Sequence, residues 1–422
     1  MVNLMGARRW VAVVLTAAAL VSGVASRSGR AHADSPTQPR WIAAWESALA
    51  GPAADGRDPS FSGGRLYSQT IREITRPTVA GAWMRVVLSN RFGTQPLRLS
   101  TVSAGIRQHG ADLDPATVSD VTFNHVRSAT VPPGSSLTSD PVPMPVAPGL
   151  DLAVSIAVMG QSSVASWHPN SLLTSYITDV RAGDHAMDSG GAAFRHPLAP
   201  LLWVSRIEVL AQAPAATVVA LGDSLTDGWR LPVDGRDRWT DVLADRLAAS
   251  EPAQRRAVVN AALAGNRIVH DGRCPYGCDP GRAAVLRADE DVFNVPGADS
   301  VIVLEGTNDL GGGASARAVI NGLSELVDRA HRHGLSVVLM TIPPWGRTGA
   351  DDARRGDVNS WIRTDTTADS FVDADLLLRD QSLPQRLDPR YDVGDGLHLS
   401  IEGMRMLAEA VDPLALGSIR RG

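Results

Sequence analysis

The chain contains little of what would mark a disulfide scaffold, a nucleic-acid-binding protein or a membrane-spanning protein. It has two cysteines among 422 residues, a formal net charge of -5 and no segment rich in Lys and Arg. Nucleic acid is therefore not expected as a partner. Apolar residues make up 44% and charged residues 20% of the chain, which is typical of a globular soluble protein. Its length is enough for two domains and a leader.

The N-terminus has the pattern of a targeting segment. Arg8 and Arg9 precede the apolar run 10–24, and Ala-His-Ala at 31–33 is a small-residue cleavage site before Asp34. The run is shorter than the roughly 20 residues that a membrane span needs. We predict a signal peptide over 1–33, a linker over 34–40, and a secreted protein with no membrane span after cleavage. A retained anchor is the alternative, and the Arg pair leaves Sec and twin-arginine export both open.

The two cysteines, Cys274 and Cys278, are separated by three residues. In an exported chain, a nearby pair is most simply a disulfide, which here would close a small loop. A redox pair usually has two intervening residues, and half a zinc site would need a second Cys/His cluster nearby. The predicted disulfide would stabilise its own loop more than the whole fold.

Residues 41–213 have the pattern of a β-rich, sandwich-like domain. Short β-rich runs, such as 82–89 and 150–158, are separated by Gly, Pro and Asn. No helical period of three or four turns interrupts them. We therefore expect short strands and no long helix before the composition changes at Ala213.

Residues 214–417 alternate apolar strands with amphipathic helices, which predicts an α/β domain with a parallel sheet and helices on both faces. Ser400 is the expected cap of the last helix, with Glu402 in its first turn. The expected strands are 218–221, 257–260, 300–304 and 335–341, and the expected helices are 238–247, 314–333 and 401–410.

Four short motifs follow one another through this second region. Gly-Asp-Ser-Leu at 222–225 comes directly after an expected strand, which places a hydroxyl at the carboxyl edge of the sheet. Gly-Asn at 265–266, Gly-Thr-Asn-Asp at 306–309 and Asp-Gly-Leu-His at 395–398 follow it. Each motif by itself could be a turn or a helix cap. Their joint occurrence, three after strands and one before the last helix, indicates a catalytic site.

The residue types suit acyl transfer to a hydroxyl nucleophile. Ser224 is the candidate nucleophile, His398 the general base and Asp395 the residue that orients the imidazole. The oxyanion donors would be the backbone N–H groups of Ser224 and Gly265 and the side-chain amide of Asn308.

The four motifs in this order resemble those of the SGNH/GDSL hydrolase family. The chain is similar to exported actinobacterial and fungal members that carry a β-rich domain before the hydrolase domain. A proline commonly follows the histidine in that group, and Leu399 stands there instead. The matching stretches are 69–72, 88–93, 238–244, 260–267 and 394–399.

The resemblance implies a flavodoxin-like three-layer hydrolase domain that cleaves esters without a metal, nucleotide or other cofactor. Family members act on lipids, aryl esters, acetylated sugars and thioesters, so the expected partner is a small-molecule, lipid or glycan ester. Loops at 267–284 and 345–357 are the expected specificity elements. Two alternatives stay open: a carbohydrate acetylesterase with the same residues, and a binding protein with a vestigial hydrolase domain.

Overall fold

The computed structural model describes residues 39–51, 64–212, 215–272, 281–364 and 367–417. The predicted signal peptide, most of the linker, and both cysteines lie outside these ranges. Residues 37–422 form one compact unit, which contains every described residue. None of the described helices is both long and apolar enough to cross a membrane.

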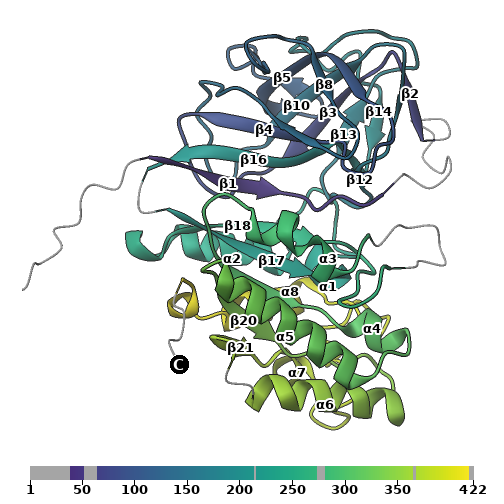
Figure 1. Cartoon of the computed structure of the whole chain (residues 1–422), viewed down its shortest axis with the longest axis vertical. Coiled ribbons are helices and arrows are strands. Elements are labelled where there is room, and N and C mark those ends of the chain that lie inside the picture. The colour runs from purple at the N-terminus through teal and green to yellow at the C-terminus, as the bar shows by residue number, and fades with distance from the viewer. Residues whose placement is uncertain (1–38, 52–63, 213–214, 273–280, 365–366, 418–422) are drawn as a thin grey trace, which may run out of the picture. The chain divides into compact units, whose positions relative to one another are not determined.

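The N-terminal part of this unit is built from β-strands (Figure 1). Two antiparallel sheets dominate it: a four-stranded sheet in the order β1-β16-β4-β9 and a larger one in the order β14-β13-β3-β10-β5-β6, with β7 and β8 also paired to β5. The strands are β1 (Arg40–Glu46), β2 (Arg65–Tyr67), β3 (Thr70–Thr75), β4 (Met84–Ser89), β5 (Leu97–His109), β6 (Asp112–Leu113), β7 (Ser119–Asp120), β8 (Ala129–Val131), β9 (Ser136–Thr138), β10 (Leu152–Val158), β11 (Gln161–Ser163), β12 (Trp167–His168), β13 (Ser175–Ile177), β14 (His196–Leu198), β15 (Leu201–Leu202) and β16 (Val204–Ala211).

One hydrophobic core joins the two antiparallel sheets. Alternate residues of the central strands point into it, including Val86 and Ile207 from the smaller sheet and Ile71 and Val154 from the larger one. All four are fully buried. Burial of each such side chain contributes roughly 1.5–3 kcal/mol. This packing of alternating β-branched residues explains why the region is made of strands, and it confirms a β-rich N-terminal region.

The C-terminal part contains a five-stranded parallel sheet in the order β18-β17-β19-β20-β21. Its strand β17, which lies between β18 and β19, is buried at every position, as expected for a parallel strand covered on both faces. The elements are β17 (Ala216–Gly222), α1 (Ser224–Asp227), α2 (Trp239–Ala248), η1 (Pro252–Gln254), β18 (Arg256–Ala262), α3 (Ala284–Ala288), the π-helical turn η2 (Asp289–Phe293), β19 (Ala298–Leu304), α4 (Thr307–Gly311), α5 (Ala316–Arg332), β20 (Ser336–Met340), α6 (Ala350–Thr364), β21 (Ser370–Val372), α7 (Ala374–Leu378), α8 (Ile401–Ala410) and η3 (Pro413–Ala415).

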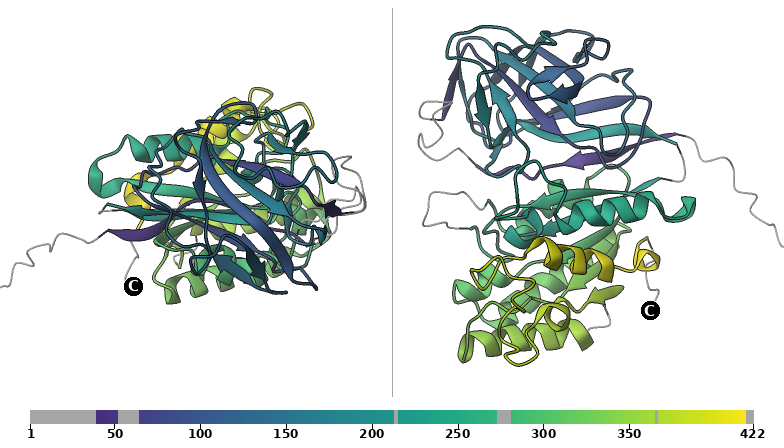
Figure 2. Two further views of the ribbon diagram at one scale, coloured as in Figure 1. Left: turned by 90° about the horizontal axis from the view of Figure 1, so that it is seen from above. Right: turned by 180° about the vertical axis from the view of Figure 1, so that it is seen from behind.

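Separate hydrophobic clusters cover the two faces of the parallel sheet. Val219 of β17 packs with Leu323 of α5 on one face. Its neighbour Val218 packs with Leu243 of α2 and Leu407 of α8 on the other. Views of the chain from opposite sides show different helices over the sheet, α5 in Figure 1 and α8 from behind in Figure 2. The parallel sheet of an α/β domain, predicted for this part of the chain, is thereby confirmed.

The expected strands and helices occur with ends no more than two residues from those predicted, whereas α6 and shorter elements such as β21 and α7 were not predicted. The loop predicted over 345–357 is wrong in its second half, because α6 begins at Ala350. The cause is the buried face of this helix, which carries Arg355 and Asn359 beside two apolar residues. Without a clear apolar stripe, the helical period is hard to read from the sequence.

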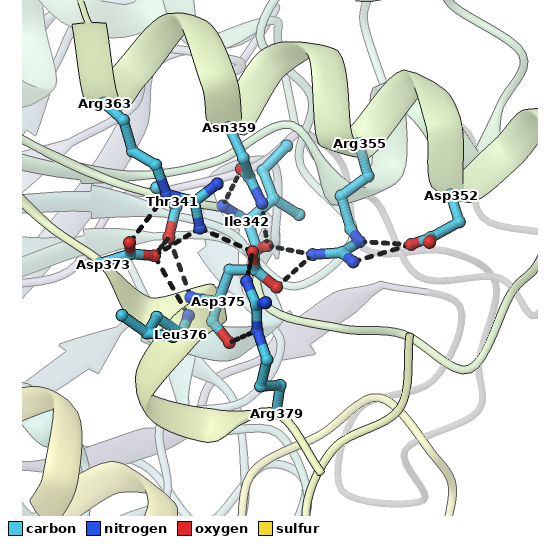
Figure 3. A network of polar contacts seen from close by, with 10 residues as sticks. All are labelled: Thr341, Ile342, Asp352, Arg355, Asn359, Arg363, Asp373, Asp375, Leu376 and Arg379. Carbon is cyan, nitrogen blue, oxygen red and sulfur yellow. Dashed lines mark hydrogen bonds and ion pairs between the residues drawn. The ribbon is translucent and has the colours of Figure 1, made fainter. Parts of the chain in front are cut away.

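Polar contacts hold α6 against the end of β20 (Figure 3). Asp375 of α7 accepts hydrogen bonds from Arg355 at 2.6 Å and Arg363 at 2.7 Å, and it also binds Arg379. Asn359 pairs with the backbone N–H and C=O of Ile342 at 2.7 and 2.9 Å. These bonds replace the missing apolar contacts and fix the segment that leaves β20.

Candidate active site

The residue after β17 is held in a tight turn at the carboxyl edge of the sheet. Asp223 caps α1, and its Oδ1 accepts a hydrogen bond from the backbone N–H of Leu225 at 2.9 Å. A Cβ on Gly222 would lie 2.2 Å from Thr226 Oγ1 and 3.0 Å from the carbonyl oxygen of Leu304. Only glycine fits there. The absence of a side chain at position 222 lets the backbone turn directly after β17, so that Ser224 is the first residue of α1.

Ser224, His398 and Asp395 form a continuous hydrogen-bonded chain. His398 Nε2 lies 3.0 Å from Ser224 Oγ, and His398 Nδ1 lies 2.8 Å from Asp395 Oδ2. Both distances are within hydrogen-bond reach. The second contact favours the tautomer with the proton on Nδ1, which leaves Nε2 free to accept the Ser224 proton.

The loop that carries Asp395 and His398 is fixed by its own hydrogen bonds. Asp392 Oδ1 accepts from the backbone N–H groups of Gly394, Asp395 and Gly396 at 2.7, 3.1 and 3.1 Å. Asp395 Oδ1 in turn accepts the backbone N–H of His398 at 2.8 Å. The loop then ends where Ser400 caps α8 with a hydrogen bond to the N–H of Gly403, as the sequence predicted.

Gly265 and Asn308 approach the same edge from β18 and β19. Gly265 has a φ of 83° and Gly306, which precedes α4, a φ of 114°, a region that favours glycine. Asn308 Nδ2 donates to Asp223 Oδ2 at 3.1 Å, so it lies against the Ser224 turn. Among the described residues, the backbone N–H groups of Ser224 and Gly265 have no intramolecular acceptor.

Asp309 ties the two neighbouring loops together. Its carboxylate accepts the backbone N–H groups of Ile268 at 2.8 Å and Val269 at 3.1 Å, both just after Gly265. Asp223 and Asp309 are thus explained by a helix cap and by backbone hydrogen bonds. The contact from Asn308 to Asp223 was not foreseen.

The carboxyl groups near Ser224 have very different environments. Burial raises the pKa of Asp223 to about 7, the hydrogen bond from Leu225 opposing this shift and the charges of Asp309 and Asp227 adding to it. For Asp395, burial acts in the same direction, but hydrogen bonds from the backbone and ring of His398 outweigh it and lower the pKa. Asp395 is therefore the acid that stays ionised beside the imidazole.

Two further residues lie beside the hydrogen-bonded series of Ser224, His398 and Asp395, and no sequence motif marks them. Arg230 Nε lies 3.0 Å from Asp395 Oδ2. The ring of Trp229 lies 6.5 Å from that of His398, measured between centroids. Both follow α1 directly, but no motif spacing marks them. Their contact with residues near 398 arises only through folding.

The described residues contain no cluster of three His, Cys, Asp or Glu side chains placed to hold a metal ion. A hydroxyl, an imidazole and a carboxylate in series can carry out nucleophilic acyl transfer, with nearby N–H groups available to a developing oxyanion.

Comparison with known protein families gave a match to the C-terminal part of the chain. The model of the GDSL-like Lipase/Acylhydrolase family matches residues 220–406. A search among curated proteins gave no match.

Solved structures that resemble the chain include three bacterial hydrolases, each similar to somewhat under half of it. A GDSL-like lipase from Bacteroides thetaiotaomicron is 18% identical over 46% of this chain and 84% of its own, with a TM-score of 0.35. A carbohydrate acetylesterase from Sinorhizobium meliloti is 20% identical over 47% and 96%, with a TM-score of 0.36. A catalytic mutant of an acetylxylan esterase from Geobacillus stearothermophilus is 20% identical over 46% and 91%, with a TM-score of 0.35.

Proposed function

We propose that this chain, whose residues 220–406 form a domain of the GDSL-like lipase/acylhydrolase family, is a serine esterase that hydrolyses carboxylic esters. The observation that carries the proposal is the hydrogen-bonded series from Ser224 Oγ through His398 to Asp395, with contacts of 3.0 and 2.8 Å. A nucleophile within reach of an oriented base is the recurring arrangement of serine hydrolases on unrelated folds.

In the first half-reaction, Ser224 Oγ attacks the ester carbonyl carbon while His398 Nε2 takes its proton. The carbonyl oxygen becomes an oxyanion in the tetrahedral intermediate. When that intermediate collapses, the bond to the leaving alcohol breaks, and protonated His398 gives its proton to the departing oxygen. The products are a free alcohol and an acyl group on Ser224.

Water completes the cycle by the same steps. His398 takes a proton from a water molecule as its oxygen attacks the acyl carbon, and a second tetrahedral intermediate forms. Collapse breaks the bond to Ser224 Oγ, which recovers its proton from His398. The carboxylic acid leaves, and throughout both halves ionised Asp395 stabilises the imidazolium that forms transiently.

In this proposal, three groups bind the oxyanion: the backbone N–H groups of Ser224 and Gly265 and the Nδ2 amide of Asn308. The first two lack an intramolecular acceptor among the described residues. The third uses one N–H on Asp223, which leaves a second N–H available. Such donors contribute because they are aligned before charge develops.

The leader and composition support several finer features of the same proposal. Residues 1–33 are a signal peptide cleaved before Asp34, the mature protein is secreted, and Cys274 and Cys278 form a disulfide. The hydrolase domain, over 214–417, is flavodoxin-like with three layers. It follows a sandwich-like domain over 41–213.

The test is hydrolysis of p-nitrophenyl acetate and butyrate by wild-type protein and by Ser224→Ala, with a fluorophosphonate probe for labelling of the nucleophile. We expect Ser224→Ala to lose hydrolysis and labelling while its thermal melting temperature is retained. Ser360→Ala, on the exposed face of α6, is the matched control and should behave as wild type. Full activity of Ser224→Ala would overturn the proposal.

Two results would favour the other functions considered. A wild-type protein that neither labels nor hydrolyses any ester would indicate a binding protein with a vestigial site. Release of acetate from acetylated polysaccharide much faster than from p-nitrophenyl acetate would identify a carbohydrate acetylesterase, which needs the same catalytic residues.

A further inference from the structure

A buried arginine, Arg287 of α3, connects the two backbone segments that carry the proposed oxyanion donors. Its Nε and Nη2 donate to Asn266 Oδ1 at 3.0 and 2.9 Å, and its Nη2 reaches the carbonyl oxygen of Gly222 at 3.4 Å. Its Nη1 donates to the carbonyl oxygen of Ala261 at 2.6 Å. Asn266 adjoins Gly265, and Gly222 lies two residues before Ser224. One rigid guanidinium therefore sets the spacing between both segments.

The charge of this guanidinium has to be balanced inside the protein. The Arg287 side chain is only 2% exposed, and an unpaired charge in such a place is costly. Asp291 Oδ2 lies 3.1 Å from Arg287 Nη1 and supplies the balancing charge. Glu305 Oε1 is 3.9 Å from Arg287 Nη2, which is too long for a hydrogen bond.

Asp291 also binds the β-rich region. Its other oxygen, Oδ1, lies 3.3 Å from Arg91 Nη1, and Arg91 Nε lies 2.9 Å from Glu290 Oε2. Arg91 comes two residues after β4, and its side chain is 15% exposed. Asp291 is thus shared between an arginine of each part of the chain. Arg206 of β16 adds a hydrogen bond to the carbonyl oxygen of Glu290 at 3.3 Å.

The π-helical turn η2 presents these two acidic side chains together. It continues α3 directly and spans Asp289–Phe293. A π-helical turn is rare, occurs frequently at functional sites and gives side chains directions that an α-helix would not. Here Glu290 and Asp291, although adjacent in sequence, both reach Arg91. The turn is therefore the physical link between the β-rich region and Arg287.

We propose that the β-rich region helps to align the oxyanion donors: Arg91 holds Asp291, Asp291 holds Arg287, and Arg287 positions the segments at Gly222 and Asn266. This inference rests on the proposed esterase function. Arg91, Asp291 and Arg287 are positioning residues, because none of them contacts the reacting atoms. Donors displaced by a fraction of an ångström stabilise the oxyanion less, so the effect falls on kcat more than on KM.

The test compares Arg91→Gln with Arg85→Gln in the full-length protein. Arg85 lies on β4, where it pairs with Glu208 inside the β-rich region, so its removal deletes the same charge without touching Asp291. With p-nitrophenyl acetate, Arg91→Gln should lower kcat about 10-fold and change KM less than 2-fold, whereas Arg85→Gln should keep the wild-type kcat. Fluorophosphonate labelling should slow in parallel.

Two further variants test whether Arg91 and Asp291 act through the same series of contacts and provide a replacement if Arg91→Gln does not fold. Asp291→Asn combined with Arg91→Gln should lower kcat no further than the more affected single variant, because both break one chain of contacts. If Arg91→Gln does not fold, Arg91→Lys replaces it, and a lowered kcat is again expected since an ammonium cannot match the two-carboxylate geometry. An unchanged kcat in the folded variant would overturn the inference. A wild-type protein without esterase activity would instead overturn the proposed function.

Discussion

Arg230 Nε and His398 Nδ1 share a single acceptor, Asp395 Oδ2, at 3.0 and 2.8 Å. The Arg230 side chain is 56% exposed, and the residue adopts a φ of 69°, which is unusual for a residue with a Cβ. Its neighbour Trp229 lies beside the His398 ring. The short segment after α1 therefore reaches back to the residues that act on Ser224.

Replacement of Arg230 by Gln should lower kcat modestly. The guanidinium lies 3.0 Å from Asp395 Oδ2 and helps to hold the carboxylate that orients His398. Without it, the imidazole is less firmly oriented toward Ser224. We expect kcat to fall about 2- to 5-fold, as for the loss of an exposed ion pair.

Two further variants serve as controls in steady-state kinetics with p-nitrophenyl acetate. Arg230→Lys retains a positive charge and should lower kcat less, while Arg317→Gln, at an exposed position of α5, controls for net charge. A wild-type kcat in Arg230→Gln would contradict this role.

Asn308→Ala should impair the chemical step. The substitution removes an amide donor and also the hydrogen bond to buried Asp223. Loss of one oxyanion donor typically lowers kcat about 100- to 1000-fold. Steady-state kinetics with p-nitrophenyl butyrate measure the effect. Asn321→Ala, exposed on α5, should leave kcat unchanged. A kcat within 3-fold of wild type for Asn308→Ala would remove Asn308 from the oxyanion site.

Glu73 of β3 should make the protein less stable as the pH rises. The residue is fully buried, and burial raises its pKa well above the usual 4.5, although hydrogen bonds from the Leu202 and Val204 backbone oppose the shift. Above about pH 4.5 the unfolded chain releases this proton while the folded chain retains it. The free energy of unfolding therefore falls with pH, by at most about 1.4 kcal/mol per unit.

Urea unfolding of Glu73→Gln between pH 5 and pH 8 tests this contribution. The neutral amide should give a smaller decrease in the free energy of unfolding than the wild-type carboxyl. Glu325→Gln, at a side chain that is 55% exposed, should retain the wild-type dependence. Parallel pH dependences for wild type and Glu73→Gln would rule out Glu73 as their source.

Asp375→Asn should destabilise the attachment of α6 and α7 (Figure 3). It removes the charge that faces Arg355, whose side chain is 6% exposed, and it weakens the contacts with Arg363 and Arg379. Breaking a buried ion pair costs about 3 kcal/mol or more in unfolding free energy. Asp352→Asn also faces Arg355 but is 30% exposed, and it should cost less than about 1 kcal/mol. Equal losses in the two variants would contradict the assignment.

Much of the candidate site follows from sequence because parallel strands end at one edge. Ser224, Gly265 and Asn308 each come shortly after an apolar strand, so their meeting could be expected from strand order alone. The position of His398 just before α8 could be predicted because Ser400, two residues later, is a typical helix cap. By contrast, Arg91 and Asp291 are 200 residues apart, and no local pattern relates them.

The amino-acid sequence by itself determined the strands, the turns after them and the residue types available for acyl transfer, since these depend on apolar periodicity and short motifs. Only the tertiary structure decided which distant charges meet: Arg230 with Asp395, and Asp291 with Arg91. Those pairings depend on burial and on distances between separate elements. A buried charge requires a partner, and only the folded chain brings residues that are distant in sequence within contact distance of it.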